Sequence, residues 1–177
     1  VGHAVCQDPG VFGRLWPQPG HRHPTGESGF TGVAVGRAMR GLRPVVEWMY
    51  DDFITVCLDP VMNQAAKMRY MTGGQVKVPI VFRAPIGAGR RNAGQHSQCL
   101  EALFTPIPGL TLASPSTGPH APGLLTSAIR TAAPAAPLAP TLLYATPAAP
   151  PDGRCLLPPG NARATHARPH LPHPTLP

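Results

Sequence analysis

The sequence predicts an α/β fold in which helices cover both faces of a parallel sheet. Between residues 26 and 130, short apolar runs bounded by glycine or proline alternate with longer segments of helical periodicity. This alternation is typical of units in which a helix connects two parallel strands and packs on the sheet. Twelve of the 25 prolines lie between residues 134 and 177, so we expect the folded part to end near residue 133.

The first predicted helix starts at Glu27 and contains the apolar run from Phe30 to Met39. Gly29, Gly32 and Gly36 recur in it at spacings of three and four residues, which places them near one face of the helix. Because a glycine inside a helix costs about 1 kcal/mol relative to alanine, three of them need a compensating role. We expect them to let another backbone approach this face closely.

The remaining elements are predicted from apolar runs and from the glycines and prolines that bound them. Strands are expected at residues 45–49, 79–82 and 109–113, with the remnant of a fourth strand at 142–144. Further helices are expected at residues 52–71, 100–104 and 123–130.

This pattern divides the chain into three parts. Residues 1–23 form an irregular N-terminal segment, residues 24–133 form the α/β domain, and residues 134–177 form a tail. The tail is rich in proline, alanine and histidine, and we expect it to be disordered because it offers few backbone donors and little apolar surface to bury. The chain has no initiator methionine, so we expect it to begin inside a longer protein.

The formal net charge of +7 comes mainly from arginines that are dispersed along the chain. Nucleic-acid binding relies on clustered basic side chains, commonly interleaved with aromatic ones, and the sequence contains no such cluster. No apolar stretch approaches the roughly 20 residues that a membrane-spanning helix needs. We therefore expect neither a nucleic-acid partner nor a membrane partner.

The spacing of cysteines and histidines gives no metal or disulfide pattern. The four cysteines contain no C-x-x-C pair, which favours reduced thiols over a disulfide framework. His166, His170 and His173 lie in a proline-rich stretch that offers no fixed ligand geometry. We expect no dedicated metal site there.

Two short patterns suggest other chemistry but lack the residues that would support it. His96, Ser97 and Cys99 place potential nucleophiles beside a base, yet adjacency in sequence is not the geometry of a catalytic triad, and no orienting residue is evident. Gly87 and Gly89 follow a predicted strand as in phosphate-binding loops, but the acidic residue that would bind a ribose is missing at the expected distance. Neither a hydrolase nor a nucleotide-binding protein is favoured.

Several motifs occur in a fixed order between residues 24 and 134. They lie at Glu27–Gly36, Gly41–Glu47, Asn63–Lys67, Tyr70–Gln75, Val78–Arg83, Gly94–Cys99, Ile107–Leu110 and Gly123–Arg130. In this order they resemble the beta subunits of pyruvate dehydrogenase, the thiamine-diphosphate-dependent, acetyl-transferring component of 2-oxo acid dehydrogenase complexes. The resemblance implies a transketolase-like pyrimidine-binding domain at residues 24–133.

The resemblance implies an enzyme that decarboxylates pyruvate oxidatively and passes the acetyl group to lipoyl groups. It implies thiamine diphosphate as cofactor, with magnesium held mainly by an alpha subunit, and a structural potassium ion. The implied partners are that alpha subunit and the lipoyl-bearing acetyltransferase of the complex. The implied location is the plastid stroma or the mitochondrial matrix, and the loop at residues 87–91 leans toward the plastid type.

Four residues match functional positions of that family. Glu27 matches the catalytic glutamate, whose carboxyl group hydrogen-bonds to the aminopyrimidine ring of the cofactor and assists proton transfer there. Phe53 matches the aromatic residue that stacks on the pyrimidine, and Met49 matches a neighbouring apolar contact. His96 matches a histidine at the mouth of the active-site channel, where it would act on the lipoyl group or the substrate.

A potassium site is implied as well. The family binds this ion partly through main-chain oxygens, and Ile80, Ala128 and Ile129 stand at those positions. Thr131 and Ala133 stand where the family tends to have Asp or Ser and Asn, which weakens the implied site.

Other departures from the family bear on activity. Around Phe53, the family's aromatic and amide side chains are replaced by Tyr50, Asp51, Asp52 and Val56, so two charges are expected to flank the pyrimidine face. The resemblance implies a C-terminal domain that would follow the tail, and we expect this domain to be missing from the chain. The alternative function is therefore a catalytically silent fragment, or an interaction module, derived from a 2-oxo acid dehydrogenase beta subunit.

Overall fold

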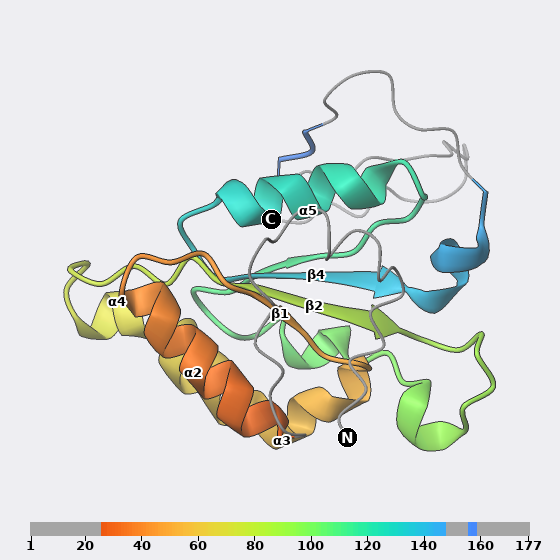
Figure 1. Cartoon of the computed structure of the whole chain (residues 1–177), viewed down its shortest axis with the longest axis horizontal. Helices are drawn as coiled ribbons and strands as arrows, with labels where there is room; N and C mark the ends of the chain where they lie inside the picture. Colours follow the sequence, from red (N-terminus) through yellow and green to blue (C-terminus); the bar gives the residue numbers. More distant parts are fainter. Residues whose placement is uncertain (1–25, 148–155, 159–177) are drawn as a thin grey trace, which may run out of the picture.

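A four-stranded parallel sheet forms the centre of the molecule (Figure 1). The computed structural model describes residues 26–147 and 156–158. The strands lie in the order β1-β2-β4-β3, and every neighbouring pair is parallel. Their bounds are Val45–Glu47 for β1, Val81–Ile86 for β2, Thr111–Ala113 for β3 and Ala135–Pro140 for β4.

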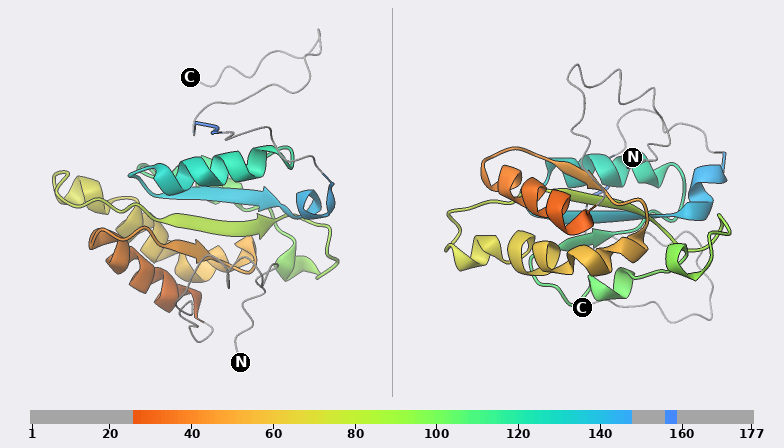
Figure 2. Two further views of the ribbon diagram at one scale, coloured as in Figure 1. Left: turned by 45° about the horizontal axis from the view of Figure 1, so that its top comes forward. Right: turned by 60° about the horizontal axis from the view of Figure 1, so that its bottom comes forward.

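Helices cover both faces of this sheet, which confirms the predicted α/β class (Figure 2). One face carries α2 (Glu27–Met39), α3 (Ile54–Asp59) and the π-helical segment η2 (Pro60–Ala65), followed by α4 (Met68–Met71). The opposite face carries α5 (His120–Arg130), which packs against β4. None of the helices in the described residues is long and apolar enough to cross a membrane.

The core between the sheet and the α2 layer is centred on Trp48, which is fully buried directly after β1. Its indole ring stacks on Phe82 of β2, with ring centroids 5.2 Å apart, and lies 6.4 Å from the ring of Phe104. The indole Nε1–H donates a hydrogen bond of 3.1 Å to the hydroxyl of Thr31, a fully buried residue of α2. Trp48 therefore joins helix α2 to β1 and β2.

Strand β4 corrects the predicted end of the domain. The sequence assigns residues 134–177 to a tail, yet residues 135–140 pair with both β2 and β3 inside the sheet. Proline lacks the N–H that a central strand normally uses, so a segment with two prolines in six residues is not predicted to form a strand. Small and apolar side chains nevertheless let it pack in the core, where Ala136 and Leu138 are fully buried.

The helix predicted at residues 52–71 is broken into shorter pieces. It begins as a 3-10 turn, η1 (Asp51–Phe53), continues as α3, and loses helical dihedral angles at Cys57, three residues before Pro60. Proline cannot donate the hydrogen bond of the helical ladder, and its ring crowds the preceding turn. The chain consequently continues in the wider π-helical η2 before α4 begins.

Three further 3-10 turns complete the described fold. They are η3 (Gly94–His96), η4 (Glu101–Leu103) and η5 (Thr141–Ala145). η4 stands where a short helix was predicted, whereas η5 replaces the strand remnant expected at residues 142–144, which was wrong. Residues 1–25, 148–155 and 159–177 lie outside the described residues, so the predictions for the N-terminal segment and the end of the tail stay predictions.

The glycines of α2 do not have the packing that their spacing predicts. A Cβ added at Gly29, Gly32 or Gly36 would meet no described atom within 4 Å. Val33, in the same part of the helix, is 48% exposed. Within the described residues no backbone approaches these three glycines closely, contrary to expectation.

Gly109 fixes a close approach between the segment before β3 and the end of η2. It has a φ of +89°, and a Cβ there would overlap the backbone carbonyl oxygen of Ala66. Gly41, just beyond α2, has a similar φ of +92°, but a Cβ there would meet nothing within 4 Å. A side chain at Gly41 would therefore cost only the strain of the left-handed backbone, whereas one at Gly109 would also overlap its neighbour.

Asp51 is a fully buried carboxylic acid at the start of η1. Its Oδ2 accepts a hydrogen bond of 2.9 Å from the backbone N–H of Leu100, whereas Oδ1 has no hydrogen-bond partner among the described residues. Burial raises the pKa of Asp51 from its usual 3.8 to about 6, and the hydrogen bond from Leu100 opposes only part of this rise.

Gly109→Ala should destabilise the fold more than Gly41→Ala does. Both variants bear the cost of a left-handed conformation, about 1 kcal/mol. Only Gly109→Ala must also displace the Ala66 carbonyl, which should add about 1–3 kcal/mol, as overpacking does. Urea unfolding followed by circular dichroism measures both losses. Equal losses would show that the segment before β3 does not pack on η2 as described.

Asp51→Asn should weaken the dependence of stability on pH. Because the folded-state pKa of Asp51 is raised, its contribution to stability is greatest below about pH 4 and falls as the pH rises through about 6. The variant cannot ionise, so between these values its free energy of unfolding should fall less than that of wild type, by at most about 3 kcal/mol. Parallel stability profiles from pH-dependent urea unfolding would contradict a buried carboxyl with a raised pKa.

Candidate functional site

Helix α2 begins at Glu27, the residue predicted to be catalytic, and the Glu27 side chain is partly exposed. Its carboxylate lies in the first turn, where the helix macrodipole favours negative charge. Thr31 follows one turn later and is held to Trp48 by the buried hydrogen bond of the core. Glu27 is therefore carried on a helix whose start is fixed against the sheet.

Cys57 lies one helical turn after the second predicted residue, Phe53. The Cys57 thiol is fully buried and donates a hydrogen bond to the backbone carbonyl of Phe53, 3.7 Å away. Burial raises the pKa of Cys57 to about 11; a hydrogen bond with Thr31 opposes this rise, and the Glu27 carboxylate adds to it. Helix α2, which begins at Glu27, packs against α3, which contains Cys57 and directly follows Phe53.

Phe53 and His96, which lie far apart in the sequence, meet in an aromatic cluster with Tyr50. The ring centroids are 5.4 Å apart for Phe53 and His96, 4.6 Å for Tyr50 and His96, and 5.9 Å for Tyr50 and Phe53. All three contacts are edge-to-face, a preferred geometry for aromatic rings. The Tyr50 hydroxyl also accepts a hydrogen bond of 2.5 Å from the Asn92 side chain. No sequence pattern indicates this last contact, which spans 42 positions.

The two carboxylates beside Phe53 do not flank an open face, which corrects the expectation from sequence. Asp51 is 0% exposed and Asp52 is 7% exposed. The Oδ1 atom of Asp52 accepts hydrogen bonds from the backbone N–H and the side-chain amide of Gln98, at 3.4 and 2.8 Å. Both acidic side chains are therefore directed into the neighbouring loop. Val56, another departure from the family, is 59% exposed.

The candidate site lies beyond the carboxyl ends of β1 and β2 (Figure 1). Met49 and Phe53 follow β1, and His96 follows β2. Ligands of open α/β sheets bind in this position, where the loops of adjacent strands meet. Met49 is 37% exposed, and Phe53 and His96 are partly exposed. Accessible apolar and aromatic groups near a carboxylate can hold a planar ring and exchange a proton with it.

The carbonyl groups predicted to bind potassium already accept hydrogen bonds. The Ile80 carbonyl accepts one of 3.0 Å from the first N–H of β4, and the Ala128 carbonyl accepts one of 3.3 Å from Thr131. The guanidinium of Arg43 donates to the carbonyls of Ile129 and Thr131, at 2.8 and 2.7 Å. A positive charge therefore already contacts part of this set. No sequence pattern indicates the role of Arg43, because its partners lie more than 80 positions away.

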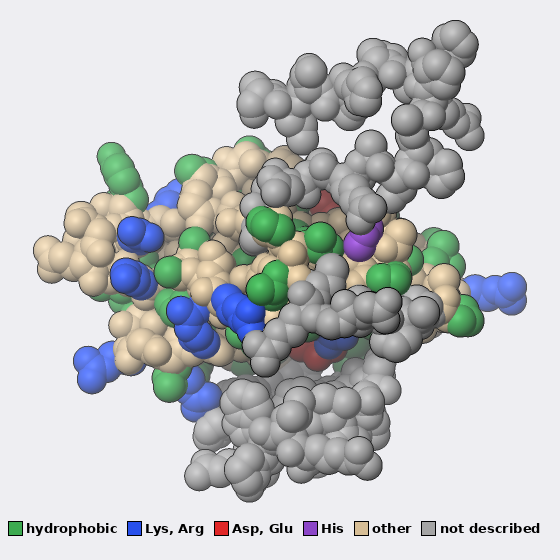
Figure 3. Space-filling view, turned by 90° about the horizontal axis from the view of Figure 1, so that it is seen from above, with side chains coloured by type: hydrophobic (Ala, Val, Ile, Leu, Met, Phe, Trp, Pro, Cys, Tyr) green, Lys and Arg blue, Asp and Glu red, His purple; other side chains and the backbone are tan. Residues whose placement is uncertain are grey.

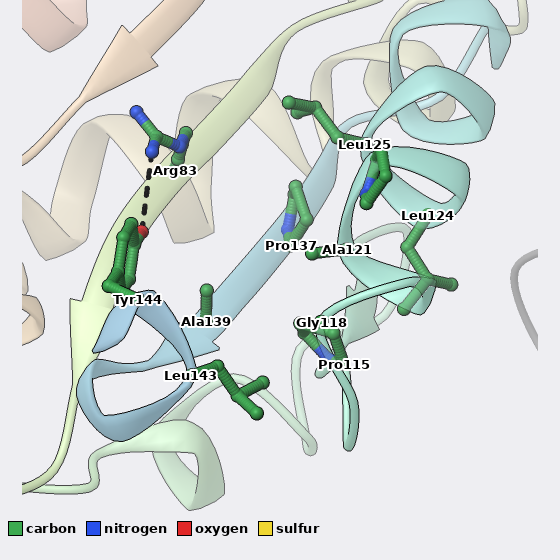
Figure 4. A pocket seen from close by; sticks show the side chains of 11 residues that line it. Arg83, Pro115, Gly118, Ala121, Leu124, Leu125, Pro137, Ala139, Leu143 and Tyr144 are labelled. Carbon is green, nitrogen blue, oxygen red and sulfur yellow. Dashed lines mark hydrogen bonds between the residues drawn. The ribbon is translucent and has the colours of Figure 1, made fainter. Parts of the chain in front are cut away.

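A groove of about 310 Å³ lies between α5 and β4, on the other side of the sheet from α2 (Figure 4). Its walls are mainly apolar. At one end, the Arg83 guanidinium donates a hydrogen bond of 3.3 Å to the Tyr144 hydroxyl and forms an ion pair of 2.9 Å with Glu47. Among the described residues, none that the sequence predicts for the site lines this groove. It is therefore separate from the candidate site.

The other patterns in the sequence gain no support from the fold. Cys99 is exposed, but partial burial and then the carboxylate of Glu101 raise its pKa, which disfavours the thiolate that a nucleophile needs. No group of three His, Cys, Asp or Glu side chains in the part of the chain that the structure describes could hold a metal ion. Lysine and arginine side chains on the α5 face are dispersed, mostly toward the end that carries α4 (Figure 3).

Known proteins are similar to most of this chain. It is 41% identical over 182 residues to human mitochondrial pyruvate dehydrogenase E1 component subunit beta, a match that covers 97% of this chain and 51% of the relative. It is 50% identical over 121 residues to the Rhizobium meliloti pyruvate dehydrogenase E1 component subunit beta, covering 68% and 26%. It is also 50% identical over 124 residues to the acetoin:2,6-dichlorophenolindophenol oxidoreductase subunit beta of Cupriavidus necator, covering 68% and 37%. The chain spans about half the length of these relatives, or less.

Residues 12–146 match the family described as "Transketolase, pyrimidine binding domain", which is more than half of the chain. The match extends through β4 and η5, in agreement with the sheet and not with a domain end at residue 133. It includes the four residues singled out around the candidate site, Glu27, Met49, Phe53 and His96. Together with the parallel sheet covered on both faces, this match shows that the chain belongs to the transketolase pyrimidine-binding domain family.

Proposed function

We propose that the chain acts as a pyruvate dehydrogenase E1 beta subunit, in the thiamine-diphosphate-dependent oxidative decarboxylation of pyruvate with acetyl transfer to lipoyl groups. The observation that carries this proposal is that Glu27 begins α2, the helix that packs against α3, and that Phe53 directly precedes α3. A carboxylate at a helix start near an accessible aromatic ring suits the aminopyrimidine part of this cofactor. The relatives named pyruvate dehydrogenase E1 subunit beta support the same assignment.

The residues present fit the pyrimidine ring of thiamine diphosphate. The ring of Phe53 is partly exposed and is held by edge contacts with Tyr50 and His96, so it is available to stack on a planar heterocycle. Met49, four positions before Phe53, offers an exposed, polarisable side chain. Glu27 supplies a carboxyl group for a ring nitrogen. The diphosphate and magnesium would be held mainly by the alpha subunit.

When bound, thiamine diphosphate supplies the electron sink for decarboxylation. The role of this chain would be to control the position of a proton at the pyrimidine ring. Glu27 would share that proton with a ring nitrogen, and the anchoring of α2 through Thr31 and Trp48 keeps the carboxyl group in a fixed position. His96 lies at the partly exposed side of the aromatic cluster, where an imidazole can exchange a proton with the substrate or a lipoyl group.

Pyruvate is the proposed substrate, and acetoin is a second candidate. The chain is 50% identical to the acetoin:2,6-dichlorophenolindophenol oxidoreductase subunit beta of Cupriavidus necator and 53% identical over 106 residues to that of Bacillus subtilis. These identities are as high as those to the pyruvate dehydrogenase subunits. Turnover of each substrate by the same reconstituted enzyme separates the two candidates.

The proposed partners are a pyruvate dehydrogenase alpha subunit and the lipoyl-bearing acetyltransferase. A mitochondrial location is supported by the names of the human, rice and Arabidopsis relatives, and a plastid location stays a prediction. A potassium ion at Ile80, Ala128 and Ile129 also stays a prediction. Each carbonyl oxygen keeps a second lone pair for such an ion, although the ion would share the Ile129 carbonyl with Arg43.

Glu27→Gln should abolish most of the activity of the reconstituted enzyme. With a pyruvate dehydrogenase alpha subunit, thiamine diphosphate, magnesium and an artificial electron acceptor, the wild-type chain should release CO2 from pyruvate. Glu27→Gln should slow this release by about 10²–10⁴-fold, the effect typical of a lost proton-transfer group. Asp59→Asn, which changes an exposed carboxylate of α3, is the matched control and should leave the rate unchanged.

Equal rates for wild type and Glu27→Gln would contradict the catalytic role of Glu27. No turnover of either pyruvate or acetoin by the wild-type pair would contradict the enzymatic function. That result would favour the catalytically silent fragment or interaction module.

A further inference from the structure

His96 lies on a segment with little regular structure. Between residues 86 and 111, all of which the structure describes, the chain forms only the three-residue turns η3 and η4. Arg91 and Ala93 have positive φ values of 56° and 63°, which residues other than glycine rarely adopt without support. The position of His96 must therefore be set by contacts with other parts of the fold.

Two side chains from the turn after β1, Tyr50 and Asp52, hold this segment on both sides of His96. The Tyr50 hydroxyl accepts the hydrogen bond of 2.5 Å from Asn92, which precedes His96. The Oδ1 atom of Asp52 accepts the two hydrogen bonds from Gln98, which follows His96. The histidine is consequently tethered four positions before and two positions after its own place in the chain.

Asp51 adds a third tether through its hydrogen bond of 2.9 Å from the Leu100 backbone. Asp51 and Asp52 are both buried, so water competes little for these hydrogen bonds. A backbone hydrogen bond of 2.8 Å from Gly87 to the Gln98 carbonyl holds the same segment toward β2.

The rings complete the arrangement. Tyr50 contacts the imidazole of His96 with its ring while its hydroxyl binds Asn92, so one side chain restrains both the loop and the histidine. We propose that the Tyr50–Asp52 turn clamps residues 92–100 and thereby positions the imidazole of His96. Its residues are positioning residues, because they act through His96. The role of this clamp in catalysis rests on the proposed function. The positioning of His96 by the clamp does not.

In this arrangement, the acidic residues beside Phe53 hold the loop that carries His96. A carboxylate pair in that place would repel an electron-rich ring if it faced the cofactor. Directed into the loop instead, Asp51 and Asp52 leave the Phe53 ring accessible and fix its neighbour His96. Tyr50, Asp51 and Asp52, which differ from the residues of the resembled family, therefore contact the loop that carries His96.

Proton NMR of His96 in the full 177-residue chain tests the clamp without cofactor or partner. Ring currents of Tyr50 and Phe53 should displace the Hδ2 and Hε1 resonances of wild-type His96 from the positions of an exposed histidine. Asp52→Ala combined with Tyr50→Phe removes the side-chain hydrogen bonds to Asn92 and Gln98 but keeps an aromatic ring at position 50. The displacement should then be largely lost, and hydrogen exchange at the Gln98 amide should accelerate about tenfold or more.

Two single variants serve as controls. Asp52→Asn keeps an acceptor oxygen for Gln98 and should retain most of the wild-type displacement of the His96 resonances. Asp59→Ala removes an exposed carboxylate that accepts a hydrogen bond from Asn63 of the following segment η2, and it should change neither the resonances nor the exchange rate.

Unchanged His96 resonances in a folded double variant would overturn the clamp. If the double variant does not fold, Tyr50→Phe alone decides: a partial shift in the same direction supports the clamp, and no shift overturns it. Exchange of the wild-type Gln98 and Leu100 amides at the rate of exposed amides would also overturn it. Absence of pyruvate turnover would count against the proposed function alone, because the NMR measurement requires no reaction.

Discussion

The buried hydrogen bond between the Trp48 indole and the Thr31 hydroxyl is the contact on which the site depends. Thr31 lies one turn after Glu27 in α2, and Trp48 follows β1 and stacks on Phe82 of β2. Leaving a buried polar group without its partner costs about 1–3 kcal/mol, so α2 cannot rotate or slide on the sheet without that loss. The position of Glu27 is therefore fixed by a residue that belongs to the sheet, which is the kind of support that a catalytic carboxylate needs.

The other half of the site is held by a different kind of contact. Phe53 and His96 come from segments of short 3-10 turns, and they are brought together by ring contacts and by hydrogen bonds to buried carboxylates. Burying Asp51 has an energetic cost, which is visible in its raised pKa. Folds commonly tolerate such a cost where function requires a fixed geometry. The two halves meet where α2 packs against α3, whose buried Cys57 thiol donates a hydrogen bond to the Phe53 carbonyl.

Periodicity predicts the parts of this fold that follow common rules. The α/β class, the start of α2 and the end of α5 all follow from apolar spacing and its interruption by glycine and proline. Strand β4 could not be predicted, because two prolines in six residues argue against a central strand. The site residues followed from family resemblance, since a lone glutamate at a helix start is usually only a favourable dipole interaction. The clamp could not be predicted, because its contacts span more than 40 positions and acidic side chains are usually exposed.

The most direct measurement is a calorimetric titration of thiamine diphosphate and magnesium into the chain paired with a pyruvate dehydrogenase alpha subunit. Binding should be saturable and should require magnesium. Phe53→Ala should weaken it about tenfold through lost stacking. Tyr70→Ala, which removes an aromatic ring that is 87% exposed on α4, should leave the affinity unchanged. No binding by the wild-type pair, or equal affinity in Phe53→Ala, would contradict a pyrimidine site formed by Glu27 and Phe53.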